Sequence, residues 1–208
     1  YFGLALLELY GATFNVSYLT KAAQISDIMS GLFCDEQNGG YFMYAKDAEQ
    51  LITRPKPIYD GAIPSGNSAA AMLLNKLAKL TAEEKCIKAA AKQLEFISAA
   101  ASAHPASHSL SLLALMEAEY PGAELICVSA ENNVPPELAE LISQKVFGNL
   151  SVLLKTSGNA EDLKMAAPFT SEYPIPESGV MYYLCRGRIC RKPVDKIEEL
   201  ENELSELF

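Results

Sequence analysis

The sequence predicts a mainly α fold followed by a small α/β portion, and two observations predict it. From residue 1 to about 120, apolar residues recur at the spacing of helices. From Pro121-Gly122 onward, short apolar runs of strand length alternate with helical segments. We therefore expect helical hairpins over residues 1–120, with a β-hairpin loop at about 38–60. An α/β subdomain over 121–208 should end in a Cys-x4-Cys tail and a helix.

The predicted helices of the first part alternate between two kinds. Residues 1–13 carry a single charge, Glu8, so this helix should be surrounded by protein as an inner helix. Residues 16–33 form an amphipathic, outer-type helix that follows Asn15, a favourable N-cap. The same alternation continues over three further segments, at 67–80, 81–101 and 106–119. If neighbouring helices are antiparallel, both outer-to-inner connections, at 34–65 and at His104, lie on one face.

The second part has a βαβ pattern. Apolar runs at 125–129 and 150–155 flank a helix at 135–147, which predicts parallel strands. A third strand is expected at 179–185, and a final helix follows Pro193. The loop after the first strand contains no glycine and two prolines, so a nucleotide-phosphate site is not expected there.

Composition excludes several classes of function. Half of the 208 residues are hydrophobic and 21% are charged, which is the composition of a globular protein. Lys and Arg number 17 against 26 Asp and Glu. The resulting net charge of −9 argues against nonspecific electrostatic binding of nucleic acid or anionic lipid. No apolar run reaches the roughly 18 residues that a membrane span needs. We expect neither nucleic acid nor a membrane as a partner.

The five cysteines and the first residue bear on the origin of the chain. An odd number of cysteines in a chain too long to need disulfide staples favours a reducing, cytoplasmic location. The sequence starts at Tyr1 without Met, inside an apolar helical segment. We therefore expect a piece of a longer protein, so the lack of a signal peptide here says nothing about the compartment of that protein.

Two separated motifs carry a family resemblance. The first consists of Gly39-Gly40-Tyr41-Phe42, Asp47-Ala48-Glu49, Arg54-Pro55-Lys56 and Asp60-Gly61-Ala62-Ile63-Pro64-Ser65-Gly66-Asn67-Ser68. The second is the tail Tyr183-Leu184-Cys185-Arg186-Gly187-Arg188-Ile189-Cys190-Arg191-Lys192-Pro193. Together they resemble the thioredoxin-domain-containing proteins of the YyaL and spermatogenesis-associated type. The resemblance implies a thioredoxin-like domain followed by a six-hairpin, glycosidase-like (α/α) toroid, of which this chain would supply a partial toroid of two and a half hairpins.

Asp60 is the candidate catalytic carboxylate. It lies before the amino end of the third helix, where unpaired N–H groups favour anions and hydroxyl oxygens. Glycoside hydrolysis uses two carboxylates, and the spacing of Asp47, Glu49 and Glu8 marks none of them as the partner. The alternative is that Asp60 and its neighbours are turn and capping residues.

Further side chains could contact a sugar, because sugar sites combine an aromatic face with hydrogen-bond donors. These candidates are Tyr41, Arg54, Ser65 and Asn67. The alternative role of Tyr41 and Arg54 is to pin the hairpin to the end of the barrel, and that of Ser65 and Asn67 is turn and capping chemistry. His104, at the second junction, could be the general base of an epimerase-like reaction, or a cap before Pro105. His108 lies one turn later without an accompanying Glu, so no metal site is expected, and no cofactor.

Cys185 and Cys190 form a candidate redox pair. A two-residue turn at Gly187-Arg188 would place them opposite each other, with Cα atoms about 4.5 Å apart, just inside disulfide range. The basic residues nearby would favour thiolates, and the family's thioredoxin-like domain would be an exchange partner. The alternative is two reduced cysteines packed under the final helix.

These observations give one leading function and two rivals. The leading one is a carbohydrate-directed site, hydrolase-like or epimerase-like, with a small carbohydrate as ligand. The rivals are a thiol-redox module that works with the thioredoxin-like domain, and a non-catalytic scaffold. If helices of the toroid lie outside this chain, apolar helix surfaces should be exposed here and could support a homodimer.

Overall fold

The computed structural model describes residues 1–49, 52–120, 122–145, 147–187 and 189–207. Within these ranges the helices of the first part are α1 (Phe2–Thr13), α2 (Val16–Phe33), α3 (Gly66–Thr81), α4 (Glu84–Ala103), the 3-10 turn η1 (Pro105–Ser107) and α5 (Ser109–Glu119). The second part comprises β1 (Ala123–Ser129), α6 (Pro136–Gln144), β2 (Leu150–Lys155), α7 (Ala160–Ala166), η2 (Pro168–Glu172), β3 (Val180–Arg186), β4 (Ile189–Cys190) and α8 (Ile197–Leu207). This order confirms a mainly α fold with an α/β portion.

Local sequence explains where the helices start and stop. The Asn15 side chain accepts a hydrogen bond from the Ser17 N–H (3.0 Å), which caps α2 as expected. Ser65 caps α3 in the same way through Ser68 N–H (3.0 Å). Helix α3 ends at its C-cap Ala82, whose left-handed φ of 53° stops the helix, and α4 begins two residues later.

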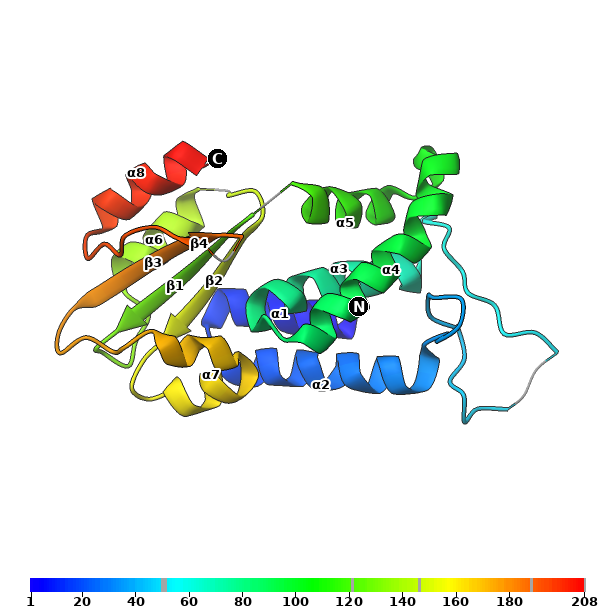
Figure 1. Cartoon of the computed structure of the whole chain (residues 1–208), viewed down its shortest axis with the longest axis horizontal. Coiled ribbons are helices and arrows are strands. Elements are labelled where there is room, and N and C mark those ends of the chain that lie inside the picture. The colour runs from blue at the N-terminus through cyan, green and yellow to red at the C-terminus, as the bar shows by residue number, and fades with distance from the viewer. Residues whose placement is uncertain (50–51, 121, 146, 188, 208) are drawn as a thin grey trace.

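The four strands form one mixed sheet in the order β2-β1-β3-β4. β1 and β2 are parallel, with Leu125 opposite Val152, and β3 runs antiparallel to β1 on its other side. The expected parallel βαβ unit is therefore confirmed. In Figure 1, α6 and α8 lie along one face of the sheet, and α1, α2 and α7 lie along the other.

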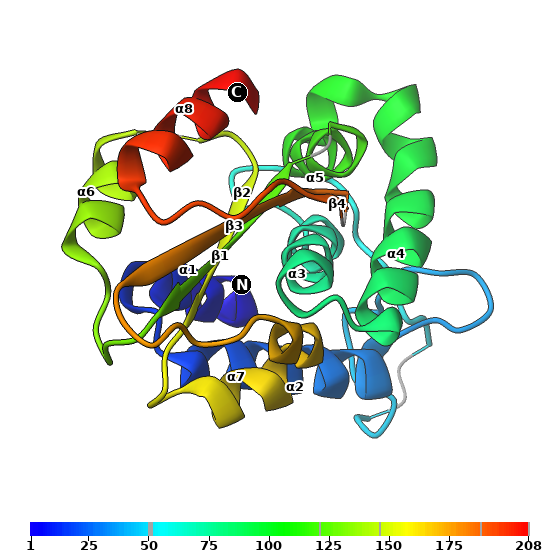
Figure 2. The ribbon, with the colours of Figure 1, turned by 60° about the vertical axis from the view of Figure 1, so that its left-hand side comes forward.

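Helix α3 lies at the centre of the helical part, between α1, α2, α4 and α5 (Figure 2). Its side chains Leu73, Leu74 and Leu77 are almost fully buried. Leu73 and Leu77 belong to a core that continues from the helices into the strands of the sheet. The helical part and the sheet are therefore packed against each other without a polar boundary.

The expectation that α1 is surrounded by protein is wrong. Leu6, Leu7 and Tyr10 are buried, but Phe2 is 70% exposed and Leu9 is 44% exposed. The open face also includes Tyr1, which is 57% exposed. Helix α5 likewise exposes the apolar side chains of Leu113 and Met116, and the adjacent Tyr120 is exposed too. The helices are apolar on more sides than their neighbours in this chain cover.

The β-hairpin expected at 38–60 is not formed in the described part of that loop. Cys34 and Tyr41 make an isolated bridge, and Met43 N–H donates to the Pro55 carbonyl (2.8 Å), but residues 52–60 otherwise follow an irregular path. Pro55 and Pro57 lack the N–H groups that a strand ladder would use. The predicted turn at 46–50 and the start of the second predicted strand at 51 include residues 50 and 51, outside the described residues.

Candidate functional site at the amino ends of α3 and α5

Asp60 joins the amino ends of two helices. Its Oδ1 accepts hydrogen bonds from Ser65 N–H (2.8 Å) and Ser68 Oγ–H (2.7 Å) at the start of α3. Its Oδ2 accepts from Leu110 N–H (2.9 Å) and Ser111 N–H (3.1 Å) in the first turn of α5. The side chain is buried, with 7% exposed. Two outer-to-inner connections thus meet on one face.

The surroundings of Asp60 keep its carboxylate ionised. Burial alone would raise its pKa, but the hydrogen bonds from Ser65, Ser68, Ser111 and Leu110 outweigh burial and lower the pKa below its ordinary value. A carboxylate offers about four lone-pair positions, and all four are used here. A general acid needs a raised pKa instead. The geometry therefore matches the capping alternative for Asp60.

Serine hydroxyls extend this cluster between the two helices. Ser68 Oγ lies 2.7 Å from Ser65 Oγ and 2.8 Å from Ser111 Oγ, and all three residues are buried. Ser65, expected to bind a substrate, therefore contacts the protein instead. Ser111 was not among the expected site residues, because nothing in its local sequence distinguishes it from other helical serines.

Asn67 and Tyr41 are in contact, and the Asn67 side chain bonds the backbone of Tyr41 and not its phenol ring. The Asn67 side chain accepts from Tyr41 N–H (2.7 Å) and donates to the carbonyls of Tyr41 and Pro57 (both 2.9 Å). Gln93 Nε2 donates to the Asn67 carbonyl oxygen (2.9 Å). Asn67 is 1% exposed and Tyr41 8%, so these two residues hold the loop onto α3 and α4 rather than face solvent.

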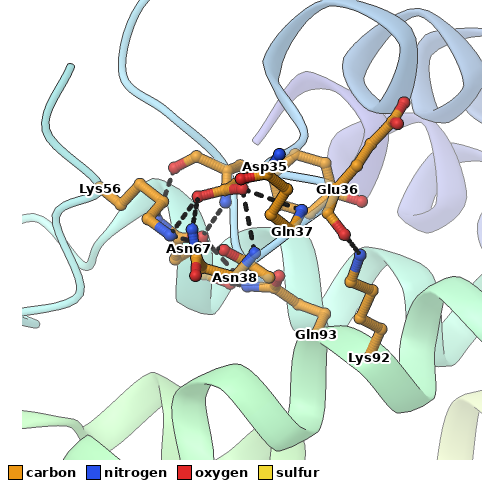
Figure 3. A network of polar contacts seen from close by, with 10 residues as sticks. Asp35, Glu36, Gln37, Asn38, Lys56, Asn67, Lys92 and Gln93 are labelled. Carbon is orange, nitrogen blue, oxygen red and sulfur yellow. Dashed lines mark hydrogen bonds and ion pairs between the residues drawn. The ribbon is translucent and has the colours of Figure 1, made fainter.

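Lys56 and Asp35 form an ion pair within the same loop, close to Asn67 (Figure 3). Lys56 Nζ donates to Asp35 Oδ2 and to the Gly39 carbonyl, both at 2.8 Å. Asp35 also accepts from the N–H groups of Gln37 and Asn38. The Lys56 bond is the main cause of an Asp35 pKa well below its ordinary range. Sequence reasoning missed this ion pair, because its partners are 21 residues apart in an irregular segment.

Arg54 lies against the protein. Its guanidinium carbon is 3.9 Å from the centroid of the Phe42 ring, and Nη2 donates to the Tyr44 carbonyl (2.9 Å). This stacked contact fixes the irregular loop at a second point. The geometry matches the alternative in which Arg54 pins the loop.

His104 remains accessible. It is exposed at the carboxyl end of α4, and its carbonyl accepts from Ser107 N–H (3.0 Å) and from His108 Nδ1–H (2.9 Å). Asp60 N–H donates to the Ser107 carbonyl (2.9 Å), which brings the loop before α3 to the η1 turn. His104 and Asp60 therefore lie at the same end of the helices.

Exposed side chains cover this end of the molecule. Tyr59 is 66% exposed and Ile63 78%, and the Tyr1 hydroxyl donates to the Pro64 carbonyl. The Asp60 charge contributes, after burial, to a raised pKa of Tyr1, so the phenol lies near the buried carboxylate. We call the following residues the amino-end surface: Tyr1, Tyr59, Ile63 and His104.

The tail cysteines form a disulfide. Cys185 in β3 and Cys190 in β4 are opposite each other in the predicted register, with Cα atoms 3.9 Å apart, and their sulfurs are bonded. Arg188, in the predicted turn, lies outside the described residues. Cys185 is 4% exposed and Cys190 is exposed. The alternative of two reduced cysteines under the final helix does not describe this structure.

Comparisons with known proteins find similar proteins that align with nearly the whole chain. The chain is 28% identical to the uncharacterized protein B0495.5 of Caenorhabditis elegans over 95% of its own length. It is 27% and 26% identical to spermatogenesis-associated protein 20 of Rattus norvegicus and Homo sapiens, over 96% of its length in both cases. The chain is similar to spermatogenesis-associated protein 20. The family expected from the two motifs is thereby confirmed.

The comparisons also set limits. The chain spans about a quarter of the length of these curated relatives, 26% for each of the three. No protein-family model matches it. The spermatogenesis-associated protein 20 relatives thus align with nearly all of this chain, whereas most of their own length has no counterpart in it.

Two cavities of the chain lie away from Asp60. One, of about 640 Å³, lies between α1, the carboxyl end of α3, α6 and β2, and is lined by residues that include Lys76, Lys79 and Asn149. The other, of about 620 Å³, lies between α2 and α7. Among the described residues, no three His, Cys, Asp or Glu side chains are grouped to hold a metal ion. In the same part of the chain, no helix combines the length and apolarity needed to cross a bilayer.

Proposed function

We propose that the amino-end surface binds carbohydrate as part of a six-hairpin, glycosidase-like protein. One observation supports this most strongly: a single buried carboxylate, Asp60, ties together the starts of α3 and α5 beneath exposed Tyr59 and Tyr1. Aromatic rings supply a rigid apolar face with a polar tip, and His104 adds an imidazole at the same end. Such a surface suits the mixed apolar and hydroxyl faces of a sugar.

Within this proposal, the role of each side chain follows from whether it is buried or exposed. Asp60, Ser65 and Asn67 position the loop, because their polar groups are already bonded to the protein. His104 is the group accessible for proton transfer in an epimerase-like reaction. A hydrolase-like reaction would take its carboxylates from elsewhere in a longer protein, since Asp60 is engaged.

The partial toroid belongs to the same proposal. Hairpins α1/α2 and α3/α4 and the single helix α5 would be two and a half hairpins, and the exposed apolar faces of α1 and α5 would pack against further hairpins of a longer chain. A second copy of the chain is the other occupant for these faces. Sedimentation of the chain at several concentrations distinguishes the two, since a homodimer sediments faster as concentration rises.

Carbohydrate binding is tested with two tyrosines of equal exposure. Tyr59, on the amino-end surface, and Tyr120, at the far end of α5, are each 66% exposed. A panel of neutral and acidic monosaccharides and disaccharides is titrated against the chain by NMR. We expect Tyr59→Ala to weaken binding at least tenfold and Tyr120→Ala to leave it unchanged. Absence of binding at millimolar sugar, or equal loss in both variants, would contradict the proposal and favour a non-catalytic scaffold.

Thiol–disulfide exchange is a second candidate function. It is favoured by the Cys185–Cys190 disulfide, which joins a buried cysteine to an exposed cysteine on a two-residue edge strand. The thioredoxin-like domain implied by the family would be its partner. Mass spectrometry of the chain before and after a dithiol should record a gain of two hydrogens that maps to this pair. A disulfide that stays intact under the dithiol would remove this candidate.

A further inference from the structure

We propose that exchange at this disulfide is directional: a reduced dithiol attacks Sγ of Cys190, and the hydroxyl of Tyr173 stabilises the departing Cys185 thiolate. This inference rests on the second candidate function above and assigns its attacked atom and a positioning residue. It follows from three observations, namely the unequal exposure of the two cysteines, the position of Tyr173 and the residue opposite Cys185.

The solvent exposure of the two cysteines indicates which sulfur a thiolate can attack. Cys190 lies in β4, at the edge of the sheet, next to Ile189, which is 79% exposed. Cys185 lies in β3, between β1 and β4, and is 4% exposed. An attacking thiolate must reach the sulfur itself, and exchange depends on which sulfur is accessible. Cys190 is therefore the electrophile, and Cys185 is the leaving group.

Tyr173 contacts both sulfurs. Its hydroxyl oxygen is 3.5 Å from Cys190 Sγ and 3.8 Å from Cys185 Sγ. Its ring meets the Tyr183 ring edge-on, with centroids 4.8 Å apart, and its carbonyl accepts from Lys155 Nζ (2.6 Å). The ring and the backbone of Tyr173 are thus both held. The hydroxyl can donate to the sulfur that becomes negatively charged.

The protonation of Tyr173 suits a hydrogen-bond donor. Burial, followed by the charges of Glu172 and Glu124, raises the pKa of its phenol above the ordinary value, so the hydroxyl keeps its proton. Glu124 also lies opposite Cys185 in the register of β1 and β3. A carboxylate beside Cys185 disfavours a thiolate there, while Arg186 and Arg191 adjoin the two cysteines in sequence. A donor at Tyr173 offsets the repulsion from Glu124.

The chemistry balances without any further reagent. A thiolate of the dithiol attacks Cys190 Sγ, the Cys185–Cys190 bond breaks, and Cys185 leaves as a thiolate that then takes a proton. The second thiol of the dithiol then loses its proton and attacks the first sulfur of the same dithiol, which is bonded to Cys190 Sγ in the mixed disulfide. This attack forms the disulfide of the reagent and releases Cys190 as a thiolate. The protein disulfide gains two electrons and two protons, and the dithiol becomes a disulfide. Strand β4 then loses its covalent link to β3 and keeps its backbone pairing with that strand.

A trapping experiment tests the direction of attack. The intact chain is treated with reduced glutathione, a monothiol that halts at the mixed disulfide, and free thiols are blocked with iodoacetamide before peptide mass spectrometry. We expect glutathione on Cys190 and the alkyl group on Cys185, in at least tenfold excess over the reverse. The reverse pattern, or an equal mixture, overturns the proposed direction even if the dithiol reduces the disulfide normally.

The role of Tyr173 is tested through the thiol it stabilises. In a Cys190→Ser background, the pKa of the Cys185 thiol is measured from the pH dependence of alkylation, with and without Tyr173→Phe. We expect Tyr173→Phe to raise this pKa and to slow dithiol reduction of the native disulfide by about tenfold, whereas Tyr120→Phe changes neither. An unchanged pKa in a variant with native circular dichroism would reject Tyr173 as the donor. Because dithiol reduction of the unmodified chain is measured separately, loss of the exchange function is distinguishable from loss of this assignment.

Discussion

The side chain of Asn67 and the backbone of Tyr41 exchange two hydrogen bonds, of 2.7 and 2.9 Å, although 26 residues separate them. The pairing imitates one rung of a β-ladder and attaches the long loop before α3 to that helix.

Replacing Asn67 should therefore free the loop. Asn67→Ala leaves Tyr41 N–H and the carbonyls of Tyr41 and Pro57 without their buried partner, so we expect a loss of about 2–4 kcal/mol in the free energy of unfolding. Urea denaturation measures the loss, and limited chymotrypsin digestion should cut faster after Phe42 and Tyr44 in the freed loop. The exposed Asn133→Ala is the control, and equal stability of both variants would contradict this account.

Asp60 should make stability depend on pH. Its pKa is lowered in the folded state, so its contribution is complete above the unfolded pKa of about 3.9 and is lost as the pH falls through the folded value. Asp60→Asn should cost about 2–4 kcal/mol at pH 7, because the amide leaves helix N–H groups unpaired. Urea denaturation from pH 7 to pH 3 should show this difference shrink at the acid end. For the exposed Asp47→Asn we expect little change at any pH, and a pH-independent Asp60 effect would be inconsistent with capping by charge.

Gly40 should not tolerate a side chain. Its φ is +76°, and a methyl group would overlap the ring of Phe96. We expect Gly40→Ala to cost about 1–3 kcal/mol. Gly66, the first residue of α3, has open space around it, so Gly66→Ala should be neutral or stabilise by about 0.5–1 kcal/mol. Thermal unfolding of the two variants checks the contrast, and equal shifts would refute it.

Lys155 should hold the η2 segment. Its buried ammonium donates to the carbonyls of Thr170 (2.7 Å) and Tyr173 (2.6 Å), and burial lowers its pKa. Lys155→Met keeps the apolar stem but removes both hydrogen bonds, so we expect a loss of about 2–3 kcal/mol by urea denaturation. Hydrogen exchange should quicken in residues 168–173. The exposed Lys164→Met serves as its control and should leave both measurements unchanged.

Helices and strands of this chain follow from local pattern, whereas the loop does not. The helical segments and the parallel strands were predictable because their apolar periodicity is carried by residues a few positions apart. The path of residues 34–65 depends on Asn67 with Tyr41 and on Lys56 with Asp35, which are contacts between distant residues without periodicity. For this reason the described part of the loop does not form the predicted hairpin.

Asp60 shows the same limit for the site. Its residue type and its place before a helix allow both catalysis and capping. The deciding donors include Leu110 and Ser111, which lie about fifty positions later in a helix of ordinary sequence. For Cys185 and Cys190, turn length predicted the register, but bond formation also depended on how the edge strand approached β3.

The core shared by the first helices and the sheet has a consequence for biosynthesis. Leu6, Leu7 and Leu19 are buried in the same cluster as Leu125 and Leu154, which leave the ribosome much later. Until β1 and β2 emerge, the first hairpin lacks the strands that cover part of its apolar side, and that part is exposed to misassociation during synthesis. We therefore expect the nascent amino-terminal half to depend on chaperones more than its helical content suggests.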